Sequence, residues 1–179
     1  MEFPGRQASV QSLVDEHYEA LYRYAYRLSG RATDAEDLVQ ETYCKAQEKL
    51  NQLREPGLAK AWLFSILRNG YLHRLRASQH PRMLSLDEVP DFAEPTENLP
   101  EVEPQKLQQA LNELPEVFRT PVIMFYFEEF SYRDIAEQME VPLGTVMSRL
   151  ARAKAYLRNR LFPPAPVAAD GQGRASDGM

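Results

Sequence analysis

The stretch SYRDIAEQMEVPLGTVMSRLARAKAYL, residues 131–157, predicts a short helix, a tight turn and a longer helix. Ser131 is a helix-capping residue type, and Asp134 falls in the first turn after it, so a helix is expected from Ser131 to about Met139. Val141 and Pro142 end that helix, and Pro142 suits the first position of the next one. The stretch is therefore expected to form a helix-turn-helix.

The second of these helices has two different faces. At about 100° per residue, one stripe is apolar and expected to be buried: Val146, Leu150, Ala153 and Leu157. The opposite face carries Ser148, Ala151, Arg152 and Ala155, and Arg149 and Lys154 flank the stripe. Small alanines let a backbone approach another surface, while hydroxyl and guanidinium groups contact bases and phosphates. We favour DNA contact over the alternative, a solvated basic face on a core helix.

The charge of the chain is unevenly distributed, although its net value is only −5. Residues 56–86 contain five basic residues and no acid, and residues 141–162 repeat that pattern. Between them, residues 87–116 hold nine acidic residues and one basic residue, Lys106. An acidic chain with two basic segments is compatible with a polyanionic partner.

Composition places the chain among ordinary globular proteins, with 44% hydrophobic and 26% charged residues. No apolar run is long enough for a membrane span, and the N-terminus has no export signal, so no membrane insertion is expected. The single cysteine, Cys44, excludes an internal disulfide framework and favours a cytoplasmic location.

The chain is expected to be all-α, with two small helical domains joined by an acidic, proline-rich linker. We assign residues 8–80 to the first domain, 81–104 to the linker, 105–162 to the second domain and 163–179 to a disordered tail.

Individual helix boundaries follow from local signals. Gly30 should end the first helix, and Thr33 with Glu36 resembles a capping box that opens the second, which should bury Ala35, Leu38, Val39, Thr42 and Ala46. A third helix is expected over 61–76 and another over 107–114, with Pro115 starting the next. Pro121 either restarts or bends that helix.

Two long stretches carry a resemblance to a known family. Residues 114–161, from LPEVFRTP to YLRNRL, resemble the fourth conserved region of extracytoplasmic-function (ECF) sigma factors, and HYEALYRYAYRLSGRATDAEDLVQETYCKA with AWLFSILRNGYLHRLR resembles their second region. The resemblance implies a non-enzymatic, dissociable subunit of bacterial RNA polymerase that directs promoter-specific transcription initiation. The second region would melt the −10 element, and the fourth would recognise the −35 element.

The resemblance also implies roles for individual residues. Ser148, Ala151 and Arg152 match the family's base-reading face, with Arg149, Lys154 and Arg158 near phosphates. The acidic start of the second helix would bind the β′ clamp helices of core polymerase: Asp34, Glu36, Asp37, Gln40 and Glu41. In the third helix the candidate −10 contacts are Lys60, Arg68, Asn69, Arg74 and Arg76, and the turn over 51–58 matches the site that captures a flipped base. Many relatives have a basic residue at Met147 and a bulkier one at Ala151.

Further partners implied by the family are the β flap of polymerase, promoter DNA and an anti-sigma factor, in a stress-response setting. No catalytic residues, cofactor or metal site are expected: the three histidines and Cys44 lack metal-ligand spacing, and no phosphate-binding loop appears. Two alternatives stay open from the residues alone, a dimeric helix-turn-helix regulator and a helical protein-binding adaptor.

Overall fold

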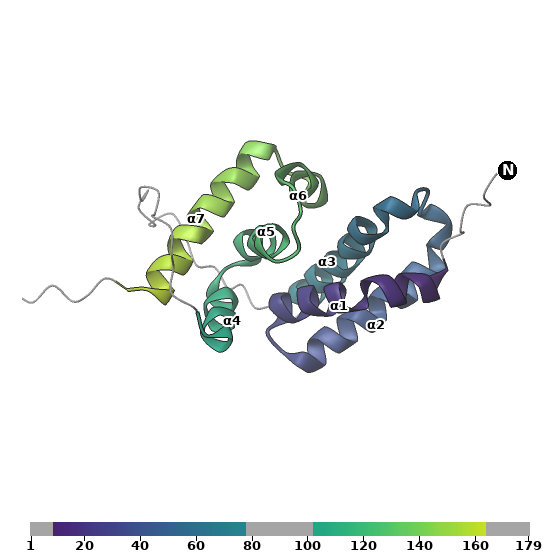
Figure 1. Ribbon diagram of the computed structural model, residues 1–179, viewed down its shortest axis with the longest axis horizontal. Coiled ribbons are helices and arrows are strands. Elements are labelled where there is room, and N and C mark those ends of the chain that lie inside the picture. Colours follow the sequence, from purple (N-terminus) through teal and green to yellow (C-terminus); the bar gives the residue numbers. More distant parts are fainter. Residues whose placement is uncertain (1–8, 78–101, 164–179) are drawn as a thin grey trace, which may run out of the picture.

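The protein is described here by a computed structural model that covers residues 9–77 and 102–163, and this part of the chain is helical without strands. The N-terminal half contains α1 (Val10–Ser29), α2 (Ala32–Glu48), the short 3-10 helices η1 (Leu50–Gln52) and η2 (Pro56–Leu58), and α3 (Ala59–Ala77). The C-terminal half contains α4 (Pro104–Glu113), α5 (Glu116–Tyr126), α6 (Tyr132–Met139) and α7 (Leu143–Leu161). The all-α prediction is confirmed (Figure 1).

The domain boundaries stay predictions. Most of the expected linker and nearly all of the expected tail lie outside the described residues. In the part that the structure describes, no helix is long and apolar enough to cross a membrane.

The junction between α1 and α2 shows one correct and one wrong boundary. Gly30 ends α1 in the left-handed conformation, with φ 76°, and its N–H donates to the Tyr26 carbonyl. The predicted capping box at Thr33 is wrong, because α2 already begins at Ala32, with Arg31 as its N-cap and no side-chain cap. Only Gly30 and Arg31 lie between the two helices, so Thr33 is inside the first turn of α2. The five residues expected to be buried in α2 are buried.

Pro121 neither restarts nor breaks the helix that contains it. Helix α5 runs through it from Glu116 to Tyr126, with Pro115 as its N-cap residue. Proline removes one backbone donor. The ring of Pro121 is buried together with Val122 and Ile123, so apolar contacts offset the lost hydrogen bond.

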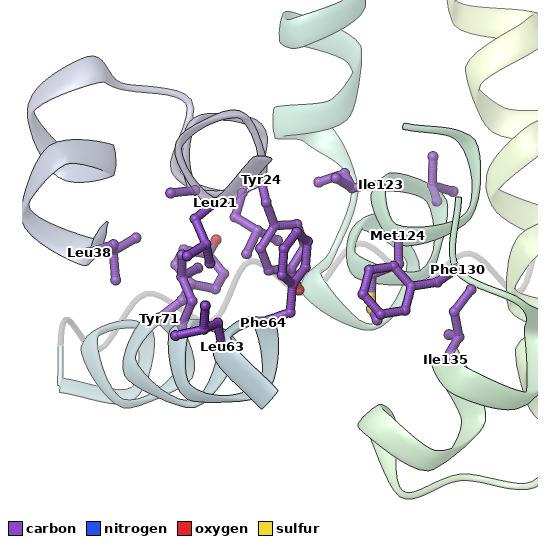
Figure 2. Close-up of a cluster of buried hydrophobic side chains, with 14 of the residues drawn as sticks. Leu21, Tyr24, Leu38, Leu63, Phe64, Tyr71, Ile123, Met124, Phe130 and Ile135 are labelled. Atoms are coloured by element: carbon purple, nitrogen blue, oxygen red, sulfur yellow. The ribbon is translucent and has the colours of Figure 1, made fainter. Parts of the chain in front are cut away.

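The two halves share one hydrophobic core. The ring of Phe64 on α3 stacks on Tyr24 of α1, with centroids 4.6 Å apart, and also lies 5.1 Å from Phe130 of the C-terminal half. Figure 2 shows the cluster passing from Tyr24 and Phe64 to Met124, Phe130 and Ile135. This packing between the halves was not predicted from the sequence.

A buried arginine also joins the halves. The guanidinium of Arg119 donates to the carbonyl of Leu28 at the end of α1, to the Leu114 carbonyl after α4, and to the Tyr71 hydroxyl of α3. The last carbonyls of a helix have no partner within it and carry partial negative charge. Arg119 therefore satisfies the ends of two helices from different halves.

Candidate nucleic-acid interface

The helix-turn-helix forms as predicted. Ser131 Oγ accepts a hydrogen bond from the Asp134 N–H (3.2 Å), and Asp134 Oδ2 accepts one from the Ser131 N–H (3.0 Å), so α6 begins with a complete capping box. The C-cap residue that follows α6 is Glu140, which adopts a left-handed conformation with a φ of 54°. Pro142 then serves as the N-cap residue of α7, one position before its predicted place.

Helix α7 buries the expected stripe against the rest of the C-terminal half. Val146, Leu150 and Ala153 are buried, and Leu157 is half-buried. The helix lies on the side of the C-terminal half away from α1 to α3 (Figure 1). Its outer face is therefore accessible to a large partner.

The candidate −35 residues are not equally exposed. Ser148, Ala151, Arg152 and Lys154 are exposed, whereas Arg149 and Arg158 are half-buried at the edges of the stripe. The Nε of Arg158 is buried and has no hydrogen-bond partner among the described residues. Ser148, Ala151 and Arg152 are placed for base contact and Lys154 for a phosphate, whereas Arg158, with its Nε buried, can present only its outer nitrogens.

The last turn of α7 is fixed to α4 by charge. The Arg160 guanidinium forms a bidentate ion pair with the Glu113 carboxylate, with Nε 2.8 Å from Oε2 and Nη2 2.9 Å from Oε1. The Tyr156 hydroxyl donates a hydrogen bond to the same carboxylate. The hydrogen bond with Glu113 raises the pKa of Arg160. Arg160 is thus engaged within the protein, and the pair holds the orientation of α7.

The predicted polymerase-binding residues share one helix but differ in surroundings. Glu36, Asp37 and Gln40 are exposed on α2, and Asp34 is half-buried. Glu41 is bound by Lys45 of its own helix and by Arg74 of α3, whose terminal nitrogen lies 2.9 Å from Oε2. The hydrogen bond from Lys45, and then that from Arg74, lowers the pKa of Glu41. Glu41 therefore also has a structural partner.

The candidate −10 residues fall into two groups. Asn69 and Arg76 are exposed, and Arg74 is engaged by Glu41. Lys60 and Arg68 instead face the C-terminal half. Lys60 donates to the Glu128 carbonyl (2.8 Å), and Arg68 lies 3.2 Å from the Glu116 carboxylate. The side chain of Arg68 is only 13% exposed.

A pocket of about 490 Å³ lies where α6 faces the turn between α2 and α3. One wall contains Arg54, Trp62, Arg68 and Asn69, and the other contains Glu137 of α6 and its C-cap residue Glu140. The turn over 51–58, predicted to capture a base, contributes Gln52, Leu53, Arg54 and Leu58. Acidic side chains of the C-terminal half thus stand opposite the predicted base-capture turn.

Some residues that shape this interface were missed by the sequence analysis. Glu128, in the loop after α5, is buried beside Arg23, and the half-buried Arg27 stacks on the ring of Phe127 at 3.7 Å. Leu143 is an exposed apolar residue of α7, and so is Met147, which was noted from the sequence only as a difference from relatives. Periodicity alone could have placed Met147 beside Ala151, but not the cluster around Glu128. Among the described residues no group of acidic, histidine or cysteine side chains is arranged to hold a metal ion.

Comparisons with known proteins agree with this architecture. Residues 13–80 match the family described as Sigma-70 region 2, and residues 105–157 match Sigma-70, region 4. The chain is 38% identical over 166 residues to the ECF RNA polymerase sigma factor SigE of Mycolicibacterium smegmatis, covering 88% of this chain and 64% of that protein. It is 34% identical over 157 residues to the ECF RNA polymerase sigma factor SigL of Mycobacterium tuberculosis, covering 84% of this chain and 88% of SigL.

A solved structure gives the same result in three dimensions. The sigma factor RpoE of Bartonella quintana, solved in complex with the anti-sigma factor NepR, superimposes with a TM-score of 0.69 and 32% identity, covering 84% of this chain and 95% of RpoE. The sigma factor family is not an enzyme family. With both conserved regions matched in order and the helix-turn-helix in place, the chain belongs to the ECF group of sigma-70 family RNA polymerase sigma factors, which direct promoter-specific transcription initiation.

Proposed function

We propose that this sigma factor recognises the −35 element with the outer face of α7 and melts the −10 element with the N-terminal half. The observation that carries the proposal is the exposed face of Ser148, Ala151 and Arg152 on a helix without any acidic residue. Arg152 donates to a base edge, and Lys154, with the outer nitrogens of Arg149 and Arg158, holds phosphates. Family membership favours this role over a dimeric regulator or an adaptor.

The protein partners follow from the same assignment. The exposed acids of α2, Glu36 and Asp37, with Gln40, Asp34 and Glu41 beside them, dock on the β′ clamp helices of core polymerase, and the C-terminal half docks on the β flap. An anti-sigma factor controls the free protein, as the complex of RpoE with NepR suggests. The protein acts in the cytoplasm, without catalytic residues or a cofactor of its own.

The −10 role requires a change in the arrangement described above. Lys60, Arg68, Asn69, Arg74 and Arg76 are the proposed contacts with the melted strand. The ammonium of Lys60 and the guanidinium of Arg68 already face Glu128 and Glu116. Because those groups cannot hold the DNA backbone while they are covered, the halves must separate before the strand binds.

The test is run-off transcription with purified core polymerase and a promoter library. The expected result is initiation from a subset of promoters that share −10 and −35 sequences. Arg152→Ala should reduce initiation from these promoters, and Asn159→Ala, an exposed control on the same helix, should retain it. If the protein fails to bind core polymerase, or initiation shows no sequence preference, the proposal is wrong.

A further inference from the structure

The outer surface of α7 has an apolar edge beside its polar face. Met147 is 51% exposed and Leu143 is 48% exposed, although both are large apolar side chains. Leu143, Met147 and Ala151 are spaced four residues apart, so they lie along one line of the helix. This line lies outside the buried stripe and next to the proposed DNA contacts.

The position of Met147 within α7 favours contact with a base. At about 100° per residue it lies roughly a quarter-turn from the centre of the buried stripe, and the line of Ala151 runs between it and Ser148. Met147 is the fifth residue of the helix, in the part that enters the major groove in helix-turn-helix proteins. The single methyl group of Ala151 leaves space beside it, which a flexible methionine side chain can use.

The charge of α7 identifies the occupant of this surface. The helix carries Arg149, Arg152, Lys154, Arg158 and Arg160 and no acid, which complements a polyanion. The polar edge groups in the major groove pair with polar side chains, whereas the C5-methyl of thymine is the group there that is matched by apolar contact. An exposed thioether side chain on the apolar edge of this cationic helix fits that methyl group.

We propose that Met147 recognises the C5-methyl of a thymine in the −35 element, while Leu143 and Ala151 exclude water from the contact. The proposal rests on the −35 role of α7 and specifies one base preference of that site.

The experiment separates the methyl group from the rest of the base. Core polymerase with the full chain first selects promoters from a duplex library whose −35 positions are randomised. Each thymine of the selected element is then replaced, one at a time, by deoxyuridine, which lacks only the methyl. Complex formation is measured for wild type, Met147→Ala, Met147→Leu and the control Tyr126→Ala, which removes an apolar side chain of similar exposure from α5.

With wild type, deoxyuridine at one position should weaken binding roughly three- to five-fold, as expected for one buried methyl group. Met147→Ala should bind thymine and deoxyuridine equally at that position, while Met147→Leu and Tyr126→Ala keep the difference. A further pair of duplexes carries cytosine or 5-methylcytosine at that position. The methylated duplex should bind more tightly to wild type, whereas Met147→Ala should bind the two duplexes equally.

The inference is overturned if wild type is insensitive to every deoxyuridine substitution, or if Met147→Ala keeps the sensitivity. In both cases promoter selection still succeeds, so the proposed function is retained. If Met147→Ala loses polymerase binding without any change in thymine preference, the apolar edge is a protein contact and the inference is also overturned. A library without any selected promoter contradicts the proposed function itself.

Discussion

The ammonium group of Lys60 on α3 donates a 2.8 Å hydrogen bond to the backbone carbonyl of Glu128, which is 68 residues further along the chain. This contact, the pairing of Arg68 with Glu116, and the hydrogen bond from the Gln138 side chain to the Ala61 carbonyl join the predicted −10 surface to the C-terminal half. The same cations are the proposed contacts for melted promoter DNA. Under the proposed −10 role, packing between the halves and binding of the −10 strand would compete for one surface.

Weakening the contact between Arg68 and Glu116 should favour strand binding. Glu116→Gln removes the negative charge that faces Arg68 across the interface, so the free protein should bind a single-stranded −10 oligonucleotide several-fold more tightly than wild type. Fluorescence anisotropy measures the affinity. Glu113→Gln makes the same change of charge on α4, where it contacts Arg160, and should leave strand affinity unchanged. Equal gains in both variants would attribute the effect to net charge.

Arg119 should be among the residues most important for stability. Arg119→Ala leaves the carbonyls of Leu28 and Leu114 without their donor inside the core and should lower the free energy of unfolding by about 3 kcal/mol. Urea denaturation followed by circular dichroism gives the value. The exposed Arg133→Ala should change stability by no more than about 0.5 kcal/mol. A similar small loss for Arg119→Ala would mean that the halves do not pack through this residue in solution.

Gly30 is required for two separate reasons. Its φ of 76° disfavours any residue with a side chain, and a Cβ there would lie 2.6 Å from the Asn112 amide of α4. Gly30→Ala should therefore lower the free energy of unfolding by more than the roughly 1 to 2 kcal/mol of backbone strain alone.

A double-mutant cycle separates the two contributions. In an Asn112→Ala background the added methyl group has space, and only the backbone cost of Gly30→Ala should remain. Additive losses would show that Asn112 does not lie against Gly30.

Glu128 should make stability depend on pH. Burial raises the pKa of this carboxyl from its ordinary value of 4.5, and the nearby Arg23, Lys60 and Arg27 only partly oppose that rise. The folded state then holds a proton that the unfolded state has released, so stability falls as pH rises from about 4.5 through the raised pKa.

Two adjacent carboxyl groups provide matched variants. Glu128→Gln removes the charge of the buried residue, and Glu129→Gln removes that of the exposed residue beside it. Glu128→Gln should remove that loss and gain stability relative to wild type as pH rises. Glu129→Gln removes only the smallest of the influences on the Glu128 pKa, so it should keep most of the wild-type slope. Urea midpoints between pH 4.5 and 7.5 measure the slopes. Parallel slopes for wild type and Glu128→Gln would contradict the raised pKa.

Arg152 and Lys154 should differ in the kind of DNA contact they make. Arg152→Ala should cost about 1 to 3 kcal/mol at the selected −35 element and relax the preference for one base pair. Lys154→Ala should weaken binding to all DNA sequences equally. It should also reduce the slope of log affinity against log salt concentration by about the amount expected for one phosphate contact. Titration of specific and random duplexes at several salt concentrations distinguishes them. Equal losses for Arg152→Ala on both duplexes would make it a phosphate contact as well.

Local features of the chain were predictable because they depend on neighbours in sequence. The N-cap of α6, the end of α1 at Gly30 and the two faces of α7 follow from residue type and a repeat of 3.6 residues. The error at Thr33 was also local, since a capping signature says nothing about how few residues the preceding turn uses. Pro121 shows the limit of propensity, because burial in α5 outweighs the loss of one hydrogen bond.

The sequence by itself thus determined the helices, the helix-turn-helix and the basic face of α7, because backbone capping and amphipathic spacing act over a few residues. Only the tertiary structure decided that Lys60 and Arg68 are covered and that Arg119 and Glu128 are buried. The physical reason is distance along the chain. The partners of Lys60, Arg68 and Arg119 lie 68, 48 and 91 residues away. A charged side chain can be stable either exposed to water or buried with a partner, and the residues next to it in sequence do not indicate which applies.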